Sequence, residues 1–414
     1  MDFSKNRDYI WNTLGTTLVS FTSLILMVLV TRINQISDAG IFTFSFSSAT
    51  IINILALYCG RTYQVTDDNS QISLSVYYST RIFTSVIAFI ISVIFCLINS
   101  YSLYKTSIFS LLCLYKCLEA VIDFYYGVEQ KNNSLYIAGQ SMTVRSIIIV
   151  LLFAIVDLIT KNLLMSCISI VLICVLFLFK VDKRKALQLE SFHITKNLKN
   201  TENLLKKASY TCFFSLISMI VINIPKYAID YLSSESVQAI YGIISMPATF
   251  VMLLGQFILQ PSLVSMAIAY RNQEKLRFNR IVVRMSIIVF ATLIMLIPVA
   301  YLLGIPVLNL IYGLDLSPHK FSLILIIIGA AFYTISQILL NALITLRCDK
   351  EQLILQIILL VLSLIISFVC VSKFNMSGSI GSYFTIMLLQ FVLYCILYFV
   401  ILNKKFRNEE ILCE

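Results

Sequence analysis

The distribution of positive charge along a very apolar chain is the feature that most constrains its fold. Hydrophobic residues make up 59% of the 414 residues, and charged residues make up only 13%. Of the 31 Lys and Arg, 22 lie on alternate connections between about twelve hydrophobic stretches, six lie on the other connections or at adjoining helix ends, and three lie inside stretches. A soluble protein of this length would need far more polar surface. The pattern therefore predicts a multi-pass membrane protein.

Each hydrophobic stretch has about the length of a bilayer-spanning helix, which needs roughly 20 apolar residues. The predicted spans are 10–32, 39–60, 77–98, 104–126, 136–157, 162–179, 207–229, 238–260, 281–303, 321–345, 352–372 and 379–402. The first stretch continues without a small-residue cleavage site, so it is interpreted as a retained helix rather than a signal peptide. The positive-inside rule places both termini in the cytoplasm, and the net charge of +10 reflects this bias rather than nucleic-acid binding.

The longest gap between spans divides the predicted helices six and six, which is typical of transporters built from two repeats. We therefore expect an all-α protein of two six-helix lobes. The expected parts are an N-terminal lobe, a basic cytoplasmic linker, a C-terminal lobe and a cytoplasmic tail, at 1–180, 181–206, 207–403 and 404–414. The basic connection is interpreted either as a linker that holds orientation charges or as a helix at the membrane surface.

The two predicted lobes differ in proline content. All six prolines lie in the second half, and Pro225 and Pro247 are expected to interrupt the first two helices of that lobe. Transmembrane helices tolerate such kinks where neighbours or water satisfy the freed carbonyl groups. The prolines thus indicate either a lobe that bends during transport or static kinks.

The cysteine and histidine pattern argues against a metal centre. The chain has 11 Cys and two His, and most of the cysteines lie in apolar segments, where Cys behaves as a small hydrophobic residue. There is no C-x-x-C motif, and the two histidines fall on opposite sides of the predicted membrane. We predict no metal site and no cofactor.

Charged residues within the spans are the candidates for chemistry, because each costs roughly 2.5–3.5 kcal/mol at a helix centre. Lys116, Glu119 and Asp123 are spaced to share one face of the fourth helix, and Arg145 lies in the fifth. The first interpretation is structural: Lys116 pairs with Glu119, and Arg145 complements Glu119 or Asp123. The alternative makes Glu119 and Asp123 a site for a coupling proton or cation.

Cations also lie near the ends of helices that hold no matching acid. Arg32 and Arg61 end the first two spans, Arg81 lies early in the third, and Lys226 follows a proline in the seventh. A pathway lined by Arg and Lys favours an anion, and the planar fork of Arg suits phosphate. An alternative explanation for the positions of Arg32 and Lys226 is that their side chains extend toward the lipid headgroups.

Several runs resemble flippases of the bacterial polysaccharide-export family. They are GRTYQVTD at 60–67, DFYYGVEQK at 123–131 followed by Gly139, Ser141 and Arg145, NIPKY at 223–227, and Gln260-Pro261. The resemblance covers the whole chain. It identifies the chain as similar to Wzx-type O-antigen or capsule repeat-unit flippases of the multidrug/oligosaccharidyl-lipid/polysaccharide (MOP) superfamily.

The resemblance implies a transporter of the bacterial inner membrane, not an enzyme. Its substrate would be an undecaprenyl-pyrophosphate-linked oligosaccharide, moved from the cytoplasmic to the outer leaflet by alternating access of the two lobes to a central cavity between them. The partners implied are this lipid-linked substrate, membrane lipids and other polysaccharide-assembly proteins. Carried over by position, Arg61 and Lys226 become pyrophosphate-binding candidates, with Arg32 and Arg81 as weaker ones.

Polar and aromatic side chains near these cations are candidates to line the sugar pathway. They are Tyr63, Gln64, Asn223, Tyr227 and Gln256. No particular sugar can be assigned to any of them from their positions alone.

Two other functions fit parts of the pattern. A cation-coupled multidrug exporter of the same superfamily would share the fold, but it is expected to carry an acid in its first helix. A membrane polysaccharide polymerase or glycosyltransferase would be expected to carry a sizeable outer loop, a soluble catalytic domain or an acidic motif. The predicted outer connections are short, and the longest gap is basic.

Overall fold

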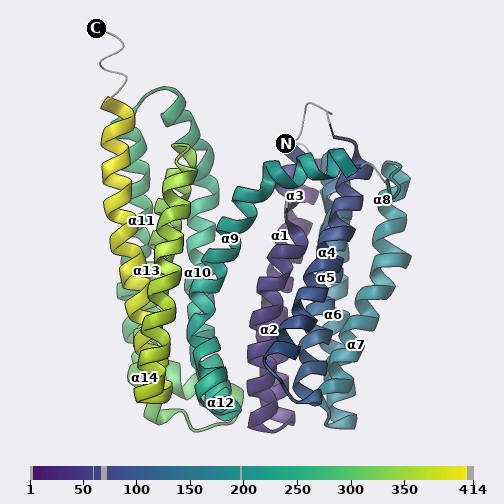
Figure 1. The fold of residues 1–414 in the computed structure, drawn as a ribbon, viewed down its shortest axis with the longest axis vertical. Coiled ribbons are helices and arrows are strands. Elements are labelled where there is room, and N and C mark those ends of the chain that lie inside the picture. The colour runs from purple at the N-terminus through teal and green to yellow at the C-terminus, as the bar shows by residue number, and fades with distance from the viewer. Residues whose placement is uncertain (1–2, 59, 67–71, 196–197, 408–414) are drawn as a thin grey trace. The chain divides into compact units, whose positions relative to one another are not determined.

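The computed structural model describes residues 3–58, 60–66, 72–195 and 198–407, and these residues are helical almost throughout. The chain divides into two compact units, unit 1 (Met1–Leu216) and unit 2 (Ile217–Glu414). The helices that lie within unit 1 are α1 (Phe3–Ile33), α2 (Ile36–Leu57), α3 (Gly60–Thr66), α4 (Leu74–Ile98), α5 (Leu103–Lys131), α6 (Leu135–Thr160), α7 (Leu163–Leu176), the π-helical η1 (Phe177–Asp182) and α8 (Lys183–Leu189) (Figure 1).

The helix α9 (Leu198–Leu232) begins in unit 1 and ends in unit 2. The remaining helices of unit 2 are α10 (Glu235–Arg271), α11 (Lys275–Val299), the π-helical η2 (Ala300–Gly304), α12 (Ile305–Tyr312), the short 3₁₀ helix η3 (Ser317–His319), α13 (Lys320–Thr345) and α14 (Asp349–Arg407). Residue Asn375 is non-helical with φ 49°, so α14 consists of two helices joined at a kink.

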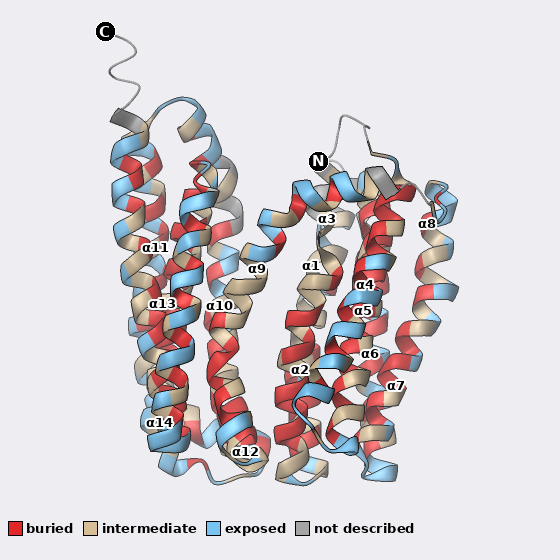
Figure 2. Ribbon diagram, in the orientation of Figure 1, coloured by how far each residue is buried: buried red, intermediate tan, exposed pale blue. Residues whose placement is uncertain are grey.

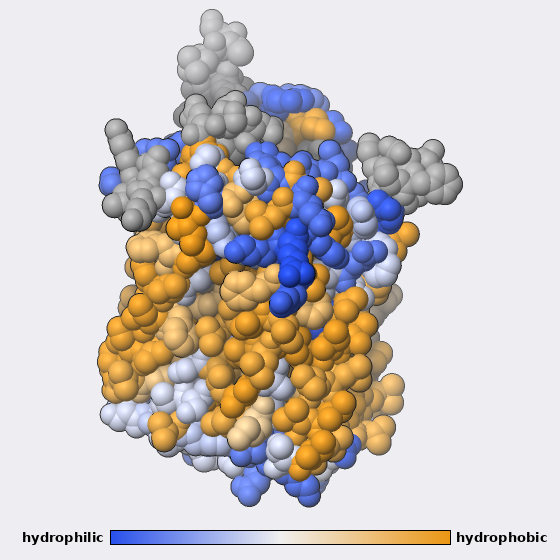
Figure 3. Space-filling view, turned by 90° about the vertical axis from the view of Figure 1, so that its right-hand side faces the viewer, coloured by the Kyte–Doolittle hydropathy of each residue, from blue (hydrophilic) through white to orange (hydrophobic). Residues whose placement is uncertain are grey.

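The number of membrane crossings agrees with the prediction of about twelve. Among the described residues, ten stretches are long and apolar enough to span a bilayer. The last of these, Lys350–Lys405, holds both halves of α14. The helix α5 adds one more crossing, because its 29 residues are long enough to span a bilayer even though it carries several charged side chains. The all-α, multi-pass class is confirmed, and Figure 3 shows a broad apolar band between two hydrophilic ends on one face.

Short polar connections separate the helices of each unit. Ser102 caps α5 by accepting a hydrogen bond from the backbone N–H of Lys105 at 3.3 Å. Asn162 caps α7 in the same way through the N–H of Leu164, at 3.0 Å. Such caps satisfy N–H groups that have no partner within the helix. At these two connections the chain turns back within a few residues, so the helices on either side run antiparallel.

Unit 1 packs around small residues where α1 meets α6. A Cβ atom added to Gly15 would lie 2.7 Å from the carbonyl oxygen of Gly139, and one added to Gly139 would collide with the backbone of Trp11. Small residues let helix backbones approach closely in a membrane, where packing rather than water exclusion drives association. Buried residues follow this contact along both helices (Figure 2).

An aromatic cluster closes the end of unit 1 that is predicted to face the cytoplasm. The ring of Phe192 lies 4.9 Å from that of Tyr78 and 5.2 Å from that of Phe124. Ala186 and Leu204, both fully buried, belong to the same cluster. Described parts of the basic connection at 181–206 thus pack on unit 1, and the boundary between the two units falls inside α9 rather than at the end of that connection.

The prolines of unit 2 lie within helices, and the kinks expected at them stay a prediction. Pro225 lies inside α9, and Pro247 lies inside α10, and both helices continue on either side. A transmembrane helix can absorb the lost hydrogen bond locally. The breaks occur elsewhere, at Asn375 in α14 and between α2 and α3, where Tyr58 and Gly60 have φ values of 42° and 62°.

Candidate functional site

The break between α2 and α3 positions Arg61. Tyr58 ends α2 with a left-handed backbone, its N–H donating to the carbonyl of Ile54, and Gly60 opens α3 at a positive φ that glycine adopts without strain. Arg61 is therefore the second residue of a new short helix rather than the last residue of a long one. Broken helices of this kind commonly mark binding sites in transporters.

Arg61 and Arg81 share one carboxylate, that of Asp123 on α5. The Nε atom of Arg61 lies 3.7 Å from Asp123 Oδ1, and the Nη1 atom of Arg81 lies 3.4 Å from Asp123 Oδ2. Arg81 also donates to the carbonyl of Ala120 at 3.2 Å. The structure thus brings together two arginines that were predicted to bind phosphate and an acid, Asp123, that was a candidate site for a coupling ion. This cluster has one more positive than negative charge.

The two arginines of this cluster differ in their remaining hydrogen-bonding capacity. The side chain of Arg81 is 4% exposed and is held against α5 from two directions, whereas that of Arg61 is 26% exposed. The Nη1 atom of Arg61 is buried and has no hydrogen-bond partner among the described residues. Arg61 can therefore offer a guanidinium edge to an anion while Asp123 holds its other side.

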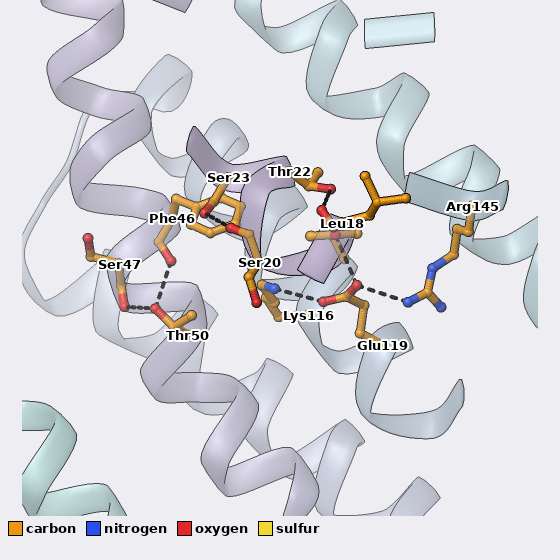
Figure 4. A network of polar contacts seen from close by, with 11 residues as sticks. Leu18, Ser20, Thr22, Ser23, Phe46, Ser47, Thr50, Lys116, Glu119 and Arg145 are labelled. Atoms are coloured by element: carbon orange, nitrogen blue, oxygen red, sulfur yellow. Dashed lines mark hydrogen bonds and ion pairs between the residues drawn. The ribbon is translucent and has the colours of Figure 1, made fainter. Parts of the chain in front are cut away.

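A second charged cluster lies deeper in unit 1, where Glu119 sits between Lys116 and Arg145 (Figure 4). The distances are 2.7 Å from Lys116 Nζ to Glu119 Oε2 and 3.1 Å from Arg145 Nη2 to Glu119 Oε1. The Tyr115 hydroxyl donates to the same carboxylate at 3.0 Å. The predicted ion pairs of Lys116 and Arg145 with Glu119 are confirmed.

This second cluster also has a surplus cation. The Nε and Nη1 atoms of Arg145 are buried and have no partner among the described residues. The Tyr126 ring lies 5.9 Å from the guanidinium carbon, which offers the cation an aromatic face. Glu119 is thus engaged by two cations and a hydroxyl, whereas its role in ion coupling stays a prediction.

Two further acids of unit 1 had no role in the sequence analysis. Glu129 and Asp182 are both fully buried. The Ser141 hydroxyl donates to Asp182 Oδ1 at 2.5 Å, whereas both carboxylate oxygens of Glu129 lack a partner among the described residues. Burying a charged carboxyl group without a partner is costly. Their only signal in the sequence was an acid at the end of an apolar stretch, which is also typical of an exposed residue.

Acids at the opposite end of unit 1 hold the helices together. Asp157 of α6 accepts hydrogen bonds from Asn34 at 2.7 Å and from Ser166 at 2.9 Å. Asp38 accepts one from the Tyr104 hydroxyl at 3.0 Å. Asp38 lies in the first turn of α2, where the helix dipole favours an acid.

The remaining candidates lie in several separate places. Arg32 is exposed in the last turn of α1. Gln64 is 2% exposed and donates to the carbonyl of Phe124 at 3.2 Å, so it packs within unit 1. The side chain of Tyr63 lies outside the described residues. In unit 2, Asn223 is buried with its Nδ2 donating to the carbonyl of Met219, and Lys226 and Tyr227 are half-buried on the same helix.

Gln256 of α10 lies apart from these residues, at a cavity of unit 2 between α10 and α13. Its side chain is exposed. Among the described residues, no group of three or more His, Cys, Asp or Glu side chains could hold a metal ion.

Comparison with known proteins relates this architecture to transporters. No protein-family model matches the chain. The chain is 23% identical over 391 residues to the capsular polysaccharide biosynthesis protein CapF of Staphylococcus aureus, a match that covers 94% of this chain and 96% of the relative. The similarity thus extends across both units.

Solved structures with a similar fold include MATE transporters. The bent form of the Vibrio cholerae MATE transporter VcmN superposes with a TM-score of 0.62 at 11% identity, over 97% of this chain and 98% of the other. An inward-facing multidrug resistance MATE family transporter of the MOP superfamily gives a TM-score of 0.63 at 13% identity, over 95% and 98%. These comparisons agree with the resemblance to the polysaccharide branch that the sequence indicated, and the chain has the all-helical fold of MOP-superfamily transporters.

Proposed function

We propose that this protein is a flippase that moves a polyprenyl-pyrophosphate-linked oligosaccharide, with undecaprenyl as the lipid, from the cytoplasmic to the outer leaflet of a bacterial inner membrane. The product would serve assembly of a capsule or O-antigen. The transporter fold supports the transport step, and the similarity to a capsular polysaccharide biosynthesis protein supports the substrate class. The protein carries out no covalent chemistry in this proposal.

The observation that carries the proposal is the cluster of Arg61, Arg81 and Asp123. Two guanidinium groups share one carboxylate, and the buried Nη1 atom of Arg61 has no partner among the described residues. A pyrophosphate supplies the acceptors that this atom lacks, and arginine binds phosphate oxygens with directional, charge-assisted hydrogen bonds. Lys226 is the corresponding candidate in unit 2.

The physical problem of the proposed reaction is to move a polar headgroup through hydrocarbon. The polyprenyl tail can remain in the bilayer, but each unpaired polar group of a pyrophosphate or sugar costs several kcal/mol in lipid. Cationic and polar side chains at membrane depth replace the lost water. With the cytoplasm negative, outward movement of each negative charge is favoured by roughly 2.3 kcal/mol per 100 mV. The membrane potential therefore favours export of an anionic headgroup, with Glu119 or Asp123 as candidates for additional ion coupling.

Export of cationic drugs is the second candidate function, because the related fold is that of multidrug transporters. The two salt-bridged clusters of unit 1 argue for an anion instead. Each holds two basic residues to one acid, and this local excess repels a cationic ligand, although the buried acids Glu129 and Asp182 lie in the same unit. The two functions are separated by the drug resistance of a strain that lacks the gene. If its resistance to cationic drugs is unchanged, drug export is excluded.

The test uses a strain that lacks the gene and makes a surface polysaccharide. Deletion should trap the lipid-linked oligosaccharide in the cytoplasmic leaflet, measured by its protection from a periplasmic glycosidase or lectin in intact cells. Reintroduced Arg61→Ala should restore less than about a tenth of surface polysaccharide, because it removes charge-assisted hydrogen bonds worth about 1.5–3 kcal/mol. Lys226→Ala should also lower export.

The matched control is Arg277→Ala. Arg277 is an exposed arginine that pairs with Glu274 at 2.8 Å on the surface of unit 2, where an ion pair contributes little. It should restore export fully, and immunoblots should show equal amounts of all variants in the membrane. Wild-type export by both Arg61→Ala and Lys226→Ala would refute the assignment of these residues.

A further inference from the structure

Unit 2 contains a cavity that the proposed pyrophosphate contacts do not use. It lies between α10 and α13 and has a volume of about 240 Å³. Three amide side chains line it, together with the ring of Tyr333, and these amides are Gln256 on α10 and Gln337 and Asn341 on α13. None of the described residues that line it is charged. The cavity is therefore polar and neutral, in contrast to the charged clusters of unit 1.

The amides on α13 are arranged for a ligand rather than for each other. Gln337 and Asn341 are four residues apart and share a face of the helix. Asn341 Nδ2 donates to the backbone carbonyl of Gln337 at 2.8 Å. The side-chain Nε2 of Gln337 is buried and has no partner among the described residues. An unpaired buried donor costs free energy, so a site that keeps one is suited to a partner from outside.

The wall of the cavity opposite these amides depends on a glycine. A Cβ atom added to Gly255 would collide with the Cγ2 atom of Thr334, so α10 can approach α13 this closely only with glycine at that position. The hydroxyl of Thr334 is already used, because it donates to the carbonyl of Ala330 at 2.8 Å. The groups left for a ligand are thus the three amides and the ring of Tyr333.

Size and chemistry select the class of ligand. Pockets for drug-sized molecules measure roughly 300–1,000 Å³, so this cavity suits a smaller group such as one sugar ring. Amides offer donors and acceptors together, which matches hydroxyl and acetamido groups, and an aromatic ring can pack on the apolar face of a sugar. A phosphate or a cationic drug would find no counter-charge here.

We propose that this cavity is a saccharide subsite of unit 2, which binds one neutral sugar residue of the transported oligosaccharide through Gln337, Asn341 and Gln256. The inference rests on the proposed function for the source of the sugar. It extends that function by separating recognition of the saccharide from recognition of the pyrophosphate.

The experiment measures binding of two soluble probes to the purified full-length protein in detergent. The first probe is the neutral oligosaccharide released by mild acid from the lipid-linked intermediate of the deletion strain, and the second is inorganic pyrophosphate. The double variant Gln337→Leu/Asn341→Leu should weaken saccharide binding about tenfold, as expected when two hydrogen bonds are lost. Its Kd for pyrophosphate should stay within about twofold of the wild-type value.

Two further variants make the result specific. Gln352→Leu replaces an amide that is 1% exposed and likewise has no side-chain partner among the described residues, but that does not line the cavity, so it should leave both Kd values unchanged. Arg61→Ala should weaken binding of pyrophosphate alone.

The outcomes separate the subsite from the proposed function. Equal saccharide binding by the wild type and the double variant, or no binding by the wild type, would overturn the subsite. The function would still stand if pyrophosphate binding depended on Arg61. If the deletion strain held no trapped lipid-linked oligosaccharide, both proposals would fall together. If Gln337→Leu/Asn341→Leu did not fold, Gln256→Leu, at an exposed position on the opposite helix, would be measured in its place.

Discussion

The interiors of the two units are polar in different ways. The buried polar residues described in unit 1 include the charged side chains of Arg81, Lys116, Glu129, Arg145 and Asp182. Those described in unit 2 are uncharged, and they include the amides of Gln238, Gln352, Gln356 and Gln390. Both units meet the same membrane environment, so the difference reflects what each interior does rather than where it lies.

The energetics of the two interiors follow from this difference. Charges at membrane depth are costly unless they are paired, and removal of one partner leaves an uncompensated charge. A buried amide costs less, and its replacement by an apolar group of similar shape is close to neutral. Unit 1 is thus suited to bind and hold charge, whereas the fully buried interior of unit 2 is suited to recognise neutral polar groups, with the half-buried Lys226 as the predicted exception.

The largest predicted effect is the loss of the shared acid of unit 1. Glu119→Leu leaves Lys116 and Arg145 buried without their carboxylate, and it should lower the free energy of unfolding by about 3–5 kcal/mol. Gln238→Leu in unit 2 replaces a fully buried amide whose side-chain atoms have no partner among the described residues, and it should change stability by less than about 1 kcal/mol. Thermal unfolding of both variants in detergent, followed by size-exclusion chromatography, compares them. Equal losses would contradict the proposed contrast between the units.

The next effect concerns packing rather than charge. Gly139→Ala should destabilise unit 1 by about 1–3 kcal/mol, because its Cβ atom would collide with the backbone of Trp11. The matched control is Gly381→Ala in α14, where an added Cβ atom meets no heavy atom within 4 Å. That variant should be neutral or slightly stabilising, since alanine favours a helix more than glycine does. The same thermal assay applies, and a loss at Gly381 as large as that at Gly139 would argue against the close helix contact.

The smallest effect separates the two roles proposed for Asp123. If Asp123 mainly balances Arg61 and Arg81, Asp123→Asn removes the carboxylate that competes with an anion for the two arginines. Binding of pyrophosphate should then tighten roughly threefold to tenfold, or about 1 kcal/mol, and should become more sensitive to salt. If Asp123 is instead a coupling site, the variant should bind pyrophosphate as the wild type does but lose the dependence of transport on a proton or sodium gradient. Calorimetric titration at two salt concentrations, together with vesicle transport, distinguishes these results.

Much of the fold and part of the site could be predicted because the signals are local. The hydropathy of each stretch, and the Lys and Arg residues beside it, can be interpreted one span at a time. Together they predict the membrane crossings. Helical spacing puts Lys116 and Glu119 on one face, and an arginine in the next helix is a natural partner for them. These predictions need no knowledge of how distant helices pack.

The rest of the site depends on contacts between distant segments. The cluster of two arginines and one acid combines side chains from three helices, with Arg61 on α3, Arg81 on α4 and Asp123 on α5. The sequence of any one of these helices does not indicate that the three side chains meet. The break before Arg61 lies in a segment without proline, while Pro225 and Pro247 lie in helices that continue. Backbone breaks here follow from packing and from positive φ values. The buried state of Glu129 was equally hidden, because its sequence context suits an exposed helix end.

The most direct test of the account is flipping by the purified protein in vesicles. The wild-type protein is reconstituted with the lipid-linked oligosaccharide, and the fraction exposed to an external lectin is followed after an inside-negative potential is imposed. The account predicts that the wild type moves the lipid outward, faster with the potential than without it, and that Arg61→Ala slows this movement at least about tenfold, whereas Arg277→Ala does not. No movement by the wild type, or equal rates for the wild type and Arg61→Ala, would contradict the claim that the cluster of Arg61, Arg81 and Asp123 binds a pyrophosphate-linked substrate during transport.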